Sequence, residues 1–193
     1  GLVCRLDPLK DVPFLLEAVH HAGSAVDRLL IVGEGPDRDR LERATERLGL
    51  SDRVIWAGHL PNPTAAYGAM DAMVLTSLYE SFGNVVLEAM AAGTPVIGRR
   101  RDDDSSSPVL VANDELIDHG RTGFLVASHD AGALARLLVD LSGDRDRLRA
   151  MRPTTHGEAR ARPWRGAIDD YLALLGWSTV RPIETEEPAQ RAA

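Results

Sequence analysis

Short apolar runs alternate with amphipathic stretches along most of the chain, which is the pattern of an α/β protein. The runs are apolar at successive positions, so both faces of each strand are expected to be buried. The sequence therefore predicts a parallel sheet covered by helices on both faces, a doubly wound α/β fold. The predicted strands are Leu2–Leu6, Arg28–Val32, Arg53–Ala57, Asp71–Ser77, Thr94–Gly98 and Gly123–Ala127, with a short extended piece at Val109–Ala112.

Helix signals fill the segments between these runs. In the first helix, Asp11 suits the N-cap and Pro13 the first turn, and Gly23 ends it after an apolar stripe. Pro153 and Pro163 are expected to interrupt the helical pattern near the end of the chain. The further predicted helices are Asp37–Leu48, Thr64–Met70, Asn84–Ala92, a turn at Asp114–His119, Asp130–Leu141, Asp144–Met151 and Trp164–Leu175.

Length and composition suit one globular domain with a tail. The chain has 193 residues, of which 44% are hydrophobic and 26% charged. We expect an ordered domain over residues 1–177 and a disordered tail over 178–193, which is rich in Glu and Pro. The chain starts directly on a strand pattern and without a start methionine, so a fragment cut near a domain boundary is expected.

Charge and cysteine content limit the classes of partner and compartment. The net charge of −7 argues against a nucleic-acid surface. Cys4 is the single cysteine and is expected to be a small core residue, which fits a reducing cytoplasm. No apolar run approaches the length of a membrane span. The polar run Arg99–Ser107, with three aspartates at its centre, is expected to be an exposed, solvated loop and no metal site.

Candidate chemistry gathers after the predicted strands. In open α/β sheets, ligands bind beyond the carboxyl ends of the strands. Four features fall at that edge and are expected to meet one ligand. They are Arg5 with Lys10, Gly33-Glu34-Gly35, Gly58-His59, and the stretch Glu80–Val85.

This edge is predicted to hold a nucleoside diphosphate. The helix starting at Gly83, Asn84 and Val85 offers free N–H groups and a positive dipole end, which suit a phosphate. Arg5 and Lys10 add two cations, and Lys10 is the single lysine among 22 basic residues.

Two carboxylates eight residues apart complete the expected site. Glu88 lies about one turn inside the helix and is placed to accept hydrogen bonds from vicinal ribose hydroxyls. Glu80, in the preceding loop, is expected to point at whatever the diphosphate carries. A hydrolase acid/base pair is the rival interpretation, and it leaves the phosphate-binding features without a role.

Three motifs together resemble a known family. They are Arg5-Leu6-Asp7-Pro8-Leu9-Lys10, Val32-Gly33-Glu34-Gly35-Pro36, and the stretch from Glu80 through Glu88 to Val96. These resemble the donor-binding half of retaining glycosyltransferases of family four, over about Leu2–Trp177. The resemblance implies a GT-B fold, with this chain as its Rossmann-like carboxy-terminal domain. A missing amino-terminal domain would bind the acceptor. The final helix within 164–176 either packs against that domain or is an ordinary amphipathic helix.

The resemblance also implies roles for single residues. Arg5 and Lys10 would bind the diphosphate, Glu88 the ribose, and Glu80 with Phe82 and Gly83 the transferred sugar. The amides after Glu80, including those of Asn84 and Val85, and the glycines Gly33 and Gly35 complete the binding set. The donor would be a UDP- or GDP-sugar, the acceptor a glycan, lipid or small molecule. Transfer would proceed with retention, without metal or cofactor, in the cytoplasm or at the inner face of the membrane.

Three departures from the family pattern stand out. Cys4 replaces a glycine before Arg5, and Asp11 replaces the glycine after Lys10. Asp11 either weakens phosphate binding or faces outward as an N-cap. The third departure is the segment Arg99–Asn113, which stands where a short Gly-rich loop is usual.

Other functions remain open at this point. A nucleotide-sugar epimerase has the same architecture, and a non-catalytic binding half would carry the same motifs. A phosphorylase using pyridoxal phosphate is disfavoured, because the single lysine, Lys10, lies early in the chain and not at a late Schiff-base position.

Overall fold

The structure, a computed structural model, describes residues 1–80, 83–103, 106 and 108–162. Within it, Gly1–Arg160 forms one compact unit. The predicted helix Trp164–Leu175 and the tail 178–193 lie outside the described residues. The domain boundary near Trp177 therefore stays a prediction.

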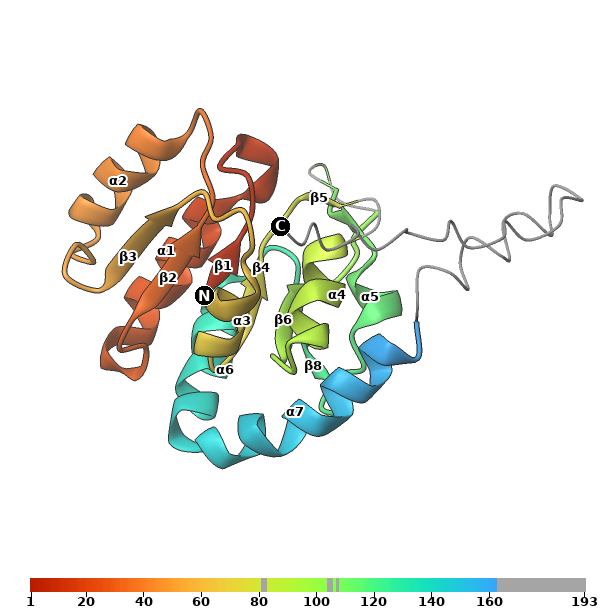
Figure 1. Cartoon of the computed structure of the whole chain (residues 1–193). Helices are drawn as coiled ribbons and strands as arrows, with labels where there is room; N and C mark the ends of the chain where they lie inside the picture. Colours follow the sequence, from red (N-terminus) through yellow and green to blue (C-terminus); the bar gives the residue numbers. More distant parts are fainter. Residues whose placement is uncertain (81–82, 104–105, 107, 163–193) are drawn as a thin grey trace, which may run out of the picture. The chain divides into compact units, whose positions relative to one another are not determined.

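Six parallel strands form the centre of this unit (Figure 1). They group into two three-stranded sheets, β1-β2-β3 and β4-β6-β8, in that spatial order. The two sheets meet at β1 and β4, where the amide of Val74 donates to the carbonyl of Gly1 over 2.7 Å. The order β3-β2-β1-β4-β6-β8 confirms the doubly wound parallel prediction. The strands are β1 Leu2–Val3, β2 Leu29–Val32, β3 Val54–Gly58, β4 Met73–Leu75, β6 Val96–Arg99 and β8 Gly123–Val126.

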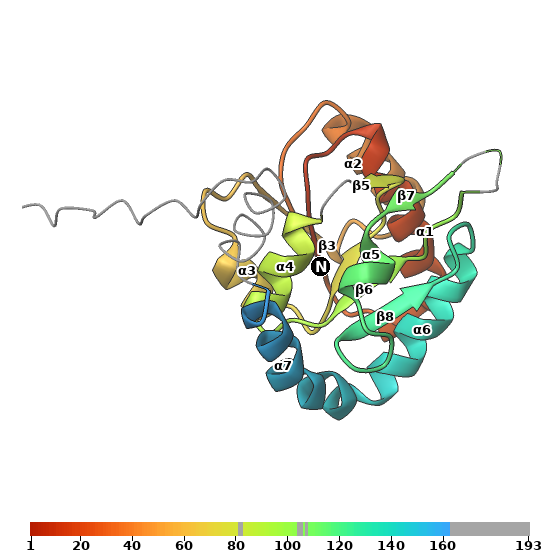
Figure 2. The same cartoon turned by 90° about the vertical axis from the view of Figure 1, so that its right-hand side faces the viewer.

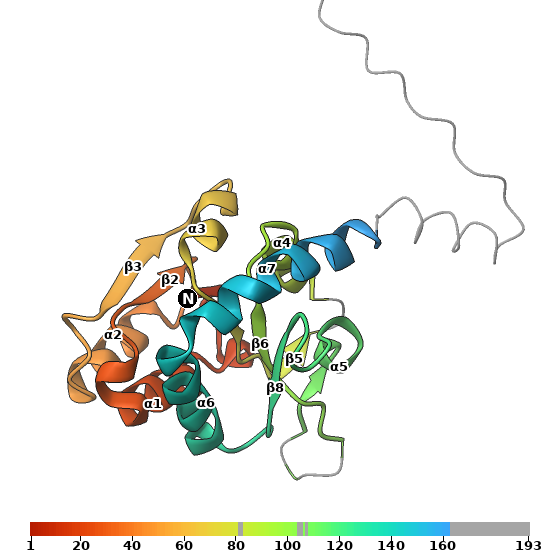
Figure 3. The same ribbon diagram turned by 90° about the horizontal axis from the view of Figure 1, so that it is seen from below.

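Helices cover both faces of these strands (Figure 3). One face is covered by α1 (Val12–Ala22), α2 (Arg38–Arg47) and α6 (Ala131–Gly143). The other carries α3 (Thr64–Ala69) and α4 (Asn84–Ala91), and α7 (Arg145–Arg160) packs against α4. The short helix α5 is Asn113–Leu116, and 3-10 turns occupy Pro8–Lys10 and Gly23–Ala25.

Alternate residues of each strand point to opposite faces and form two separate cores. On the α1 side, Leu2, Ile31 and Ile97 are fully buried or nearly so. Their neighbours in the chain, such as Val3 and Val32, are buried against α3 and α4. Burying one large apolar side chain contributes about 1.5–3 kcal/mol, so a strand that is buried on both faces gains from each of its apolar residues. The edge strand β3 differs, because its Ile55 is 48% exposed.

Pro153 does not break the last described helix, contrary to the sequence prediction. It lies inside α7, which continues to Arg160. Pro153 is exposed, while Met151 and Thr155 on either side of it are buried. The Thr155 hydroxyl also donates to the carbonyl of Met151 over 3.0 Å. Tertiary packing of these neighbours outweighs the hydrogen bond that proline removes.

A third, two-stranded parallel sheet was missed by the sequence prediction. It pairs β5 (Tyr79–Glu80) with β7 (Leu110–Val111), as Figure 2 shows. Glu80 was expected in a loop and instead lies in β5. The reason is long-range pairing with β7, which no local pattern around Glu80 reveals.

The exposed-loop prediction for Arg99–Ser107 is wrong at its first residue. Arg99 is the last residue of β6 and is only 2% exposed, whereas Arg100, Arg101 and Asp103 are exposed. Asn113, at the far end of the unusual segment, is also buried and donates from Nδ2 to the Arg99 carbonyl over 2.9 Å. Both ends of the segment therefore belong to the interior.

Candidate functional site

The strand order reverses between β1 and β4, and the loops that leave their carboxyl ends lie together. The amide of Leu78 donates to the Leu9 carbonyl over 2.8 Å, and the Thr76 hydroxyl donates to the Lys10 carbonyl over 2.9 Å. Such a switch point is where doubly wound folds bind their ligands. The edge predicted from sequence is thus formed by two loops that are bonded to each other.

Lys10 and Glu80 form an ion pair at this edge. The Lys10 ammonium donates to Glu80 Oε2 over 2.6 Å, and the two side chains are 20% and 18% exposed. Lys10 ends a 3-10 turn whose N-cap, Asp7, accepts a hydrogen bond from the amide of Leu9. The structure therefore brings together two residues that lie 70 positions apart in the chain.

Arg5 lies on the same loop but reaches into solvent. Its side chain is 74% exposed, and its Nε is 3.9 Å from the Asp7 carboxylate. A weak contact at that distance leaves the guanidinium available to an anion. The structure places Arg5 after β1, as predicted, without bonding it to Glu80.

Helix α4 has its N-cap at Gly83, three residues after Glu80. Gly83 has φ +74, and a Cβ there would meet Leu116 Cδ1 at 3.0 Å. The first turn holds no acidic residue, and Gly83 has no side chain with which to cap it. Asn84 is exposed and Val85 half-buried. Phe82 lies outside the described residues, so its predicted contact stays a prediction. The end of α4 suits an anion, as the sequence indicated.

Glu88 is held by a tyrosine that the sequence interpretation missed. The hydroxyl of Tyr67, a buried residue of α3, donates to Glu88 Oε2 over 2.7 Å. Burial, and then the neighbouring Glu88, raise the pKa of Tyr67, so its hydroxyl stays protonated and remains a donor. Glu88 itself is exposed. A single tyrosine among Ala and Gly in a short predicted helix was the available signal.

The two glycines after β2 have a packing role. A Cβ on Gly33 would meet the Cys4 carbonyl oxygen at 1.8 Å, and one on Gly35 the Leu6 carbonyl oxygen at 2.1 Å. The loop after β2 thus lies directly against the loop after β1. Contact of these glycines with a ligand stays a prediction.

Cys4 is a buried core residue, as predicted. Burial raises the pKa of its thiol to about 12, so the thiol is protonated at neutral pH.

A second ion pair joins the end of β6 to the start of α1. Arg99 Nη1 donates to Asp11 Oδ2 over 2.6 Å and to the Thr76 carbonyl over 2.9 Å. The Arg99 side chain is 3% exposed and that of Asp11 26%. Asp11 occupies the N-cap of α1, but its side chain makes no capping bond. The N-cap position predicted for Asp11 is confirmed, but the alternative in which its side chain faces outward is wrong, because the carboxylate binds Arg99. Sequence interpretation also missed Arg99, which it placed in an exposed loop.

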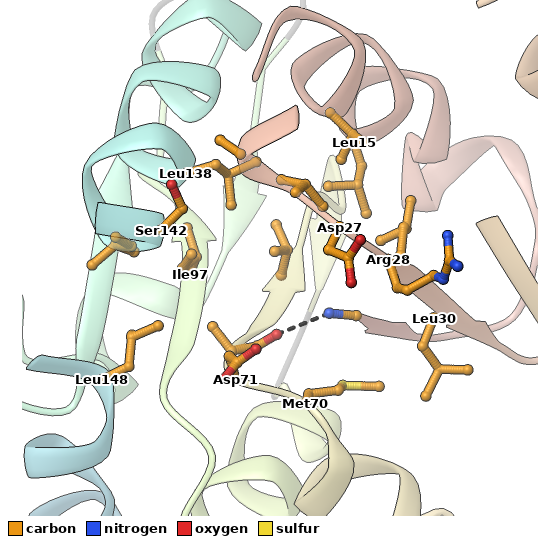
Figure 4. Close-up of a pocket in the computed structure, with 18 of the residues that line it drawn as sticks. Leu15, Asp27, Arg28, Leu30, Met70, Asp71, Ile97, Leu138, Ser142 and Leu148 are labelled. Atoms are coloured by element: carbon orange, nitrogen blue, oxygen red, sulfur yellow. Dashed lines mark hydrogen bonds between the residues drawn. The ribbon is translucent and has the colours of Figure 1, made fainter. Parts of the chain in front are cut away.

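A pocket of about 370 Å³ lies at the opposite edge of the sheet (Figure 4). It is lined by residues at the amino ends of strands and by α6, among them Leu30, Met70 and Leu138. The Gly1 amine donates to the Ala72 carbonyl there over 2.9 Å. Neither ion pair contributes to this pocket. The predicted site and this pocket thus occupy different edges.

The strand order, the helices on both faces and the charged switch point define one half of a GT-B glycosyltransferase. A comparison with family models identifies the family of glycosyltransferases. The chain belongs to the family Glycosyl transferases group 1, whose model matches residues 1–144. The glycosyltransferase resemblance seen in the sequence is thereby confirmed, and assignment to family four stays a prediction.

Characterised relatives carry the same half. The chain is 35% identical to the D-inositol 3-phosphate glycosyltransferase of Nocardia farcinica, over 91% of this chain and 40% of that protein. It is 34% identical to the N-acetyl-alpha-D-glucosaminyl L-malate synthase of Bacillus anthracis, over 74% of this chain and 35% of that protein. The chain thus spans well under half the length of these two relatives.

Solved structures agree with the fold. HepE of Anabaena, in complex with UDP, has a TM-score of 0.76 and 26% identity, over 90% of this chain and 48% of that one. Sucrose-phosphate synthase of Thermosynechococcus elongatus has a TM-score of 0.73 and 28% identity, over 91% and 44%. Within the described residues, we find no helix with the length and apolar character that crossing a membrane needs.

Proposed function

We propose that this chain is the nucleotide-sugar-binding half of a retaining glycosyltransferase of family four. The observation that carries the proposal is the Lys10–Glu80 ion pair at the β1/β4 switch point. The names of the relatives, and UDP in the complex of the Anabaena protein, support the same donor class.

The diphosphate of a UDP- or GDP-sugar would replace Glu80 as the partner of Lys10. Both side chains are partly exposed, so this exchange needs no unfolding. Arg5 and the N-terminus of α4 would share the negative charge of the diphosphate. Stabilising the departing diphosphate is then the main contribution of this half to catalysis.

The two glutamates would bind the two remaining parts of the donor, the ribose and the transferred sugar. Glu88, oriented by Tyr67, would accept hydrogen bonds from the ribose hydroxyls. Glu80, released from Lys10, would face the transferred sugar. Neither role requires a metal or a cofactor, and the donor is the substrate.

The other parts of the reaction belong to the rest of the protein. An amino-terminal domain would bind the acceptor, whether a glycan, a lipid or a small molecule. The enzyme would work in the cytoplasm, with peripheral association at the membrane if the acceptor is a lipid.

Binding of UDP and GDP to the purified chain tests the proposal by calorimetry. Lys10→Ala and Glu88→Ala are each expected to weaken the better nucleotide about 10- to 100-fold, because each removes a charged hydrogen-bonding partner. Arg149→Ala is the control, since Arg149 is an exposed residue of α7 paired with Asp146. Equal affinity in all four proteins would sink the assignment.

A second experiment separates transfer from epimerisation. The full-length protein is incubated with a nucleotide-sugar and no acceptor, and the products are resolved by chromatography. We expect the donor sugar to keep its configuration. An epimer of the donor would contradict the proposed transferase.

A further inference from the structure

Asp11 places a carboxylate immediately beside Lys10. It is the single non-glycine residue with a positive φ, +43, among the residues that the structure describes. This left-handed conformation favours glycine, which is also what the resemblance led us to expect at this position. The Asp11 side chain is 26% exposed, so it is not sealed from the edge where Lys10 lies.

Arg99 holds that carboxylate from beneath. Besides Asp11, its guanidinium donates to the carbonyls of Thr76 and Ser128. It also lies 4.1 Å from the ring centroid of Phe14, in the first turn of α1. With three hydrogen-bonded partners and a ring against it, the guanidinium has a fixed position.

Thr76 connects this buried pair to the open one. Its carbonyl accepts from Arg99, and its hydroxyl donates to the Lys10 carbonyl. Lys10 and Asp11 are thus both tied, one through the backbone and one through the side chain, to the end of β4.

Carboxylates outnumber cations around the proposed donor site, even with Arg99 included. The predicted cations Arg5 and Lys10 stand against the carboxylates Asp7, Asp11, Glu80 and Glu88, and Arg99 offsets the charge of Asp11. A diphosphate adds further negative charge to the same edge, and repulsion between like charges lowers its affinity.

We infer that Arg99 is a positioning residue of the donor site: it neutralises Asp11 and turns its carboxylate inward, so that Lys10 can accept a diphosphate. The inference rests on the proposed function. Arg99 touches no substrate in this account and acts through Asp11.

Four proteins test this inference by calorimetric titration with the better-binding of UDP and GDP. Arg99→Met removes the cation, and Arg99→Lys keeps it while losing the planar fork. Asp11→Gly/Arg99→Met removes both charges of the pair. Arg53→Met is the control for lost stability, because Arg53 bonds the carbonyls of Gly23 and Val26, away from Lys10 and Asp11.

Arg99→Met is expected to bind the nucleotide about tenfold more weakly than the parent. Arg99→Lys, the double variant and Arg53→Met should stay within about twofold of the parent. The matching nucleoside, followed by ligand-observed NMR, should bind parent and Arg99→Met alike, because it carries no phosphate. A purely structural role for Arg99 would not distinguish nucleotide from nucleoside.

The inference fails if Arg99→Met binds the nucleotide like the parent, or if the double variant binds as weakly as Arg99→Met. If Arg99→Met does not fold, the nucleotide affinity of the double variant tests the inference instead. A tenfold loss of that affinity overturns the inference. No nucleotide binding by the parent chain would instead overturn the proposed function, and the inference with it.

Discussion

Lys10 and Asp11 are neighbours in the chain, yet each pairs in a different region of the same edge. Lys10 meets Glu80 at the open surface, where both side chains are about one-fifth exposed. Asp11 meets Arg99, whose side chain is only 3% exposed, although the Asp11 side chain itself is 26% exposed. We call these the outer pair and the inner pair.

The two pairs differ in how far their cations are exposed, and this suits them to different roles. Both partners of the outer pair keep about one-fifth of their side-chain surface in water, so solvent can compensate part of the loss of either partner. The inner pair has a buried cation that no solvent can compensate, so removing its partner is costly. The outer pair is therefore suited to exchange with an anion, and the inner pair to holding the loops in place.

The largest effect is expected from the inner pair. Arg99→Met should lower the free energy of unfolding by about 3 kcal/mol or more, because the carbonyls of Thr76 and Ser128 lose their donor. Urea unfolding followed by circular dichroism measures this. A loss below about 1 kcal/mol would mean that the inner pair is no more structural than the outer one.

The fold was predictable because its determinants are local. The central strands are mostly apolar, and glycines such as Gly49 and Gly93 end the helices with a positive φ. The β5/β7 pair was missed since Glu80 and Val111 meet only through long-range pairing. The helix break predicted at Pro153 is wrong, because packing of the neighbouring residues outweighs the hydrogen bond that proline removes.

The outer layer of the site was predictable for a similar reason. Lys10 and Glu80 follow strands, and strand ends of a parallel sheet share one edge. The inner layer was not predictable, because Arg99 belongs to a run of polar residues and only its contacts show that it is buried. Tyr67 was missed likewise, because its place in a short predicted helix marks it as unusual but does not show that α3 lies beside Glu88.

Asp11→Gly removes the carboxylate of the inner pair. It leaves the buried guanidinium without a carboxylate, but it relieves the positive φ of Asp11 by about 1 kcal/mol. A net loss of about 2 kcal/mol in the free energy of unfolding is expected. Asp11→Asn is the matched variant, because asparagine tolerates this backbone and still accepts a hydrogen bond. If Asp11→Gly stabilised the chain, the charge on Asp11 would contribute nothing to the inner pair.

Tyr67→Phe tests whether Glu88 also depends on a lower layer. The change removes the hydroxyl that donates to Glu88 and little else, so it should cost about 1 kcal/mol of stability. Under the proposed function, nucleotide affinity should fall a few-fold, because Glu88 loses its orientation. Tyr79→Phe is the control, since Tyr79 is an exposed residue of β5. Equal affinities in both variants would contradict an orienting role for Tyr67.

The smallest effect on stability is expected from the outer pair. Lys10→Met and Glu80→Gln should each change the free energy of unfolding by about 1 kcal/mol or less, because both side chains reach solvent. The contrast appears when nucleotide is added. At 100 times its dissociation constant, UDP or GDP should stabilise the parent by about 2.7 kcal/mol, and the same concentration should stabilise Lys10→Met far less. A Lys10→Met protein that unfolds as readily as Arg99→Met without nucleotide would remove the distinction between the two pairs.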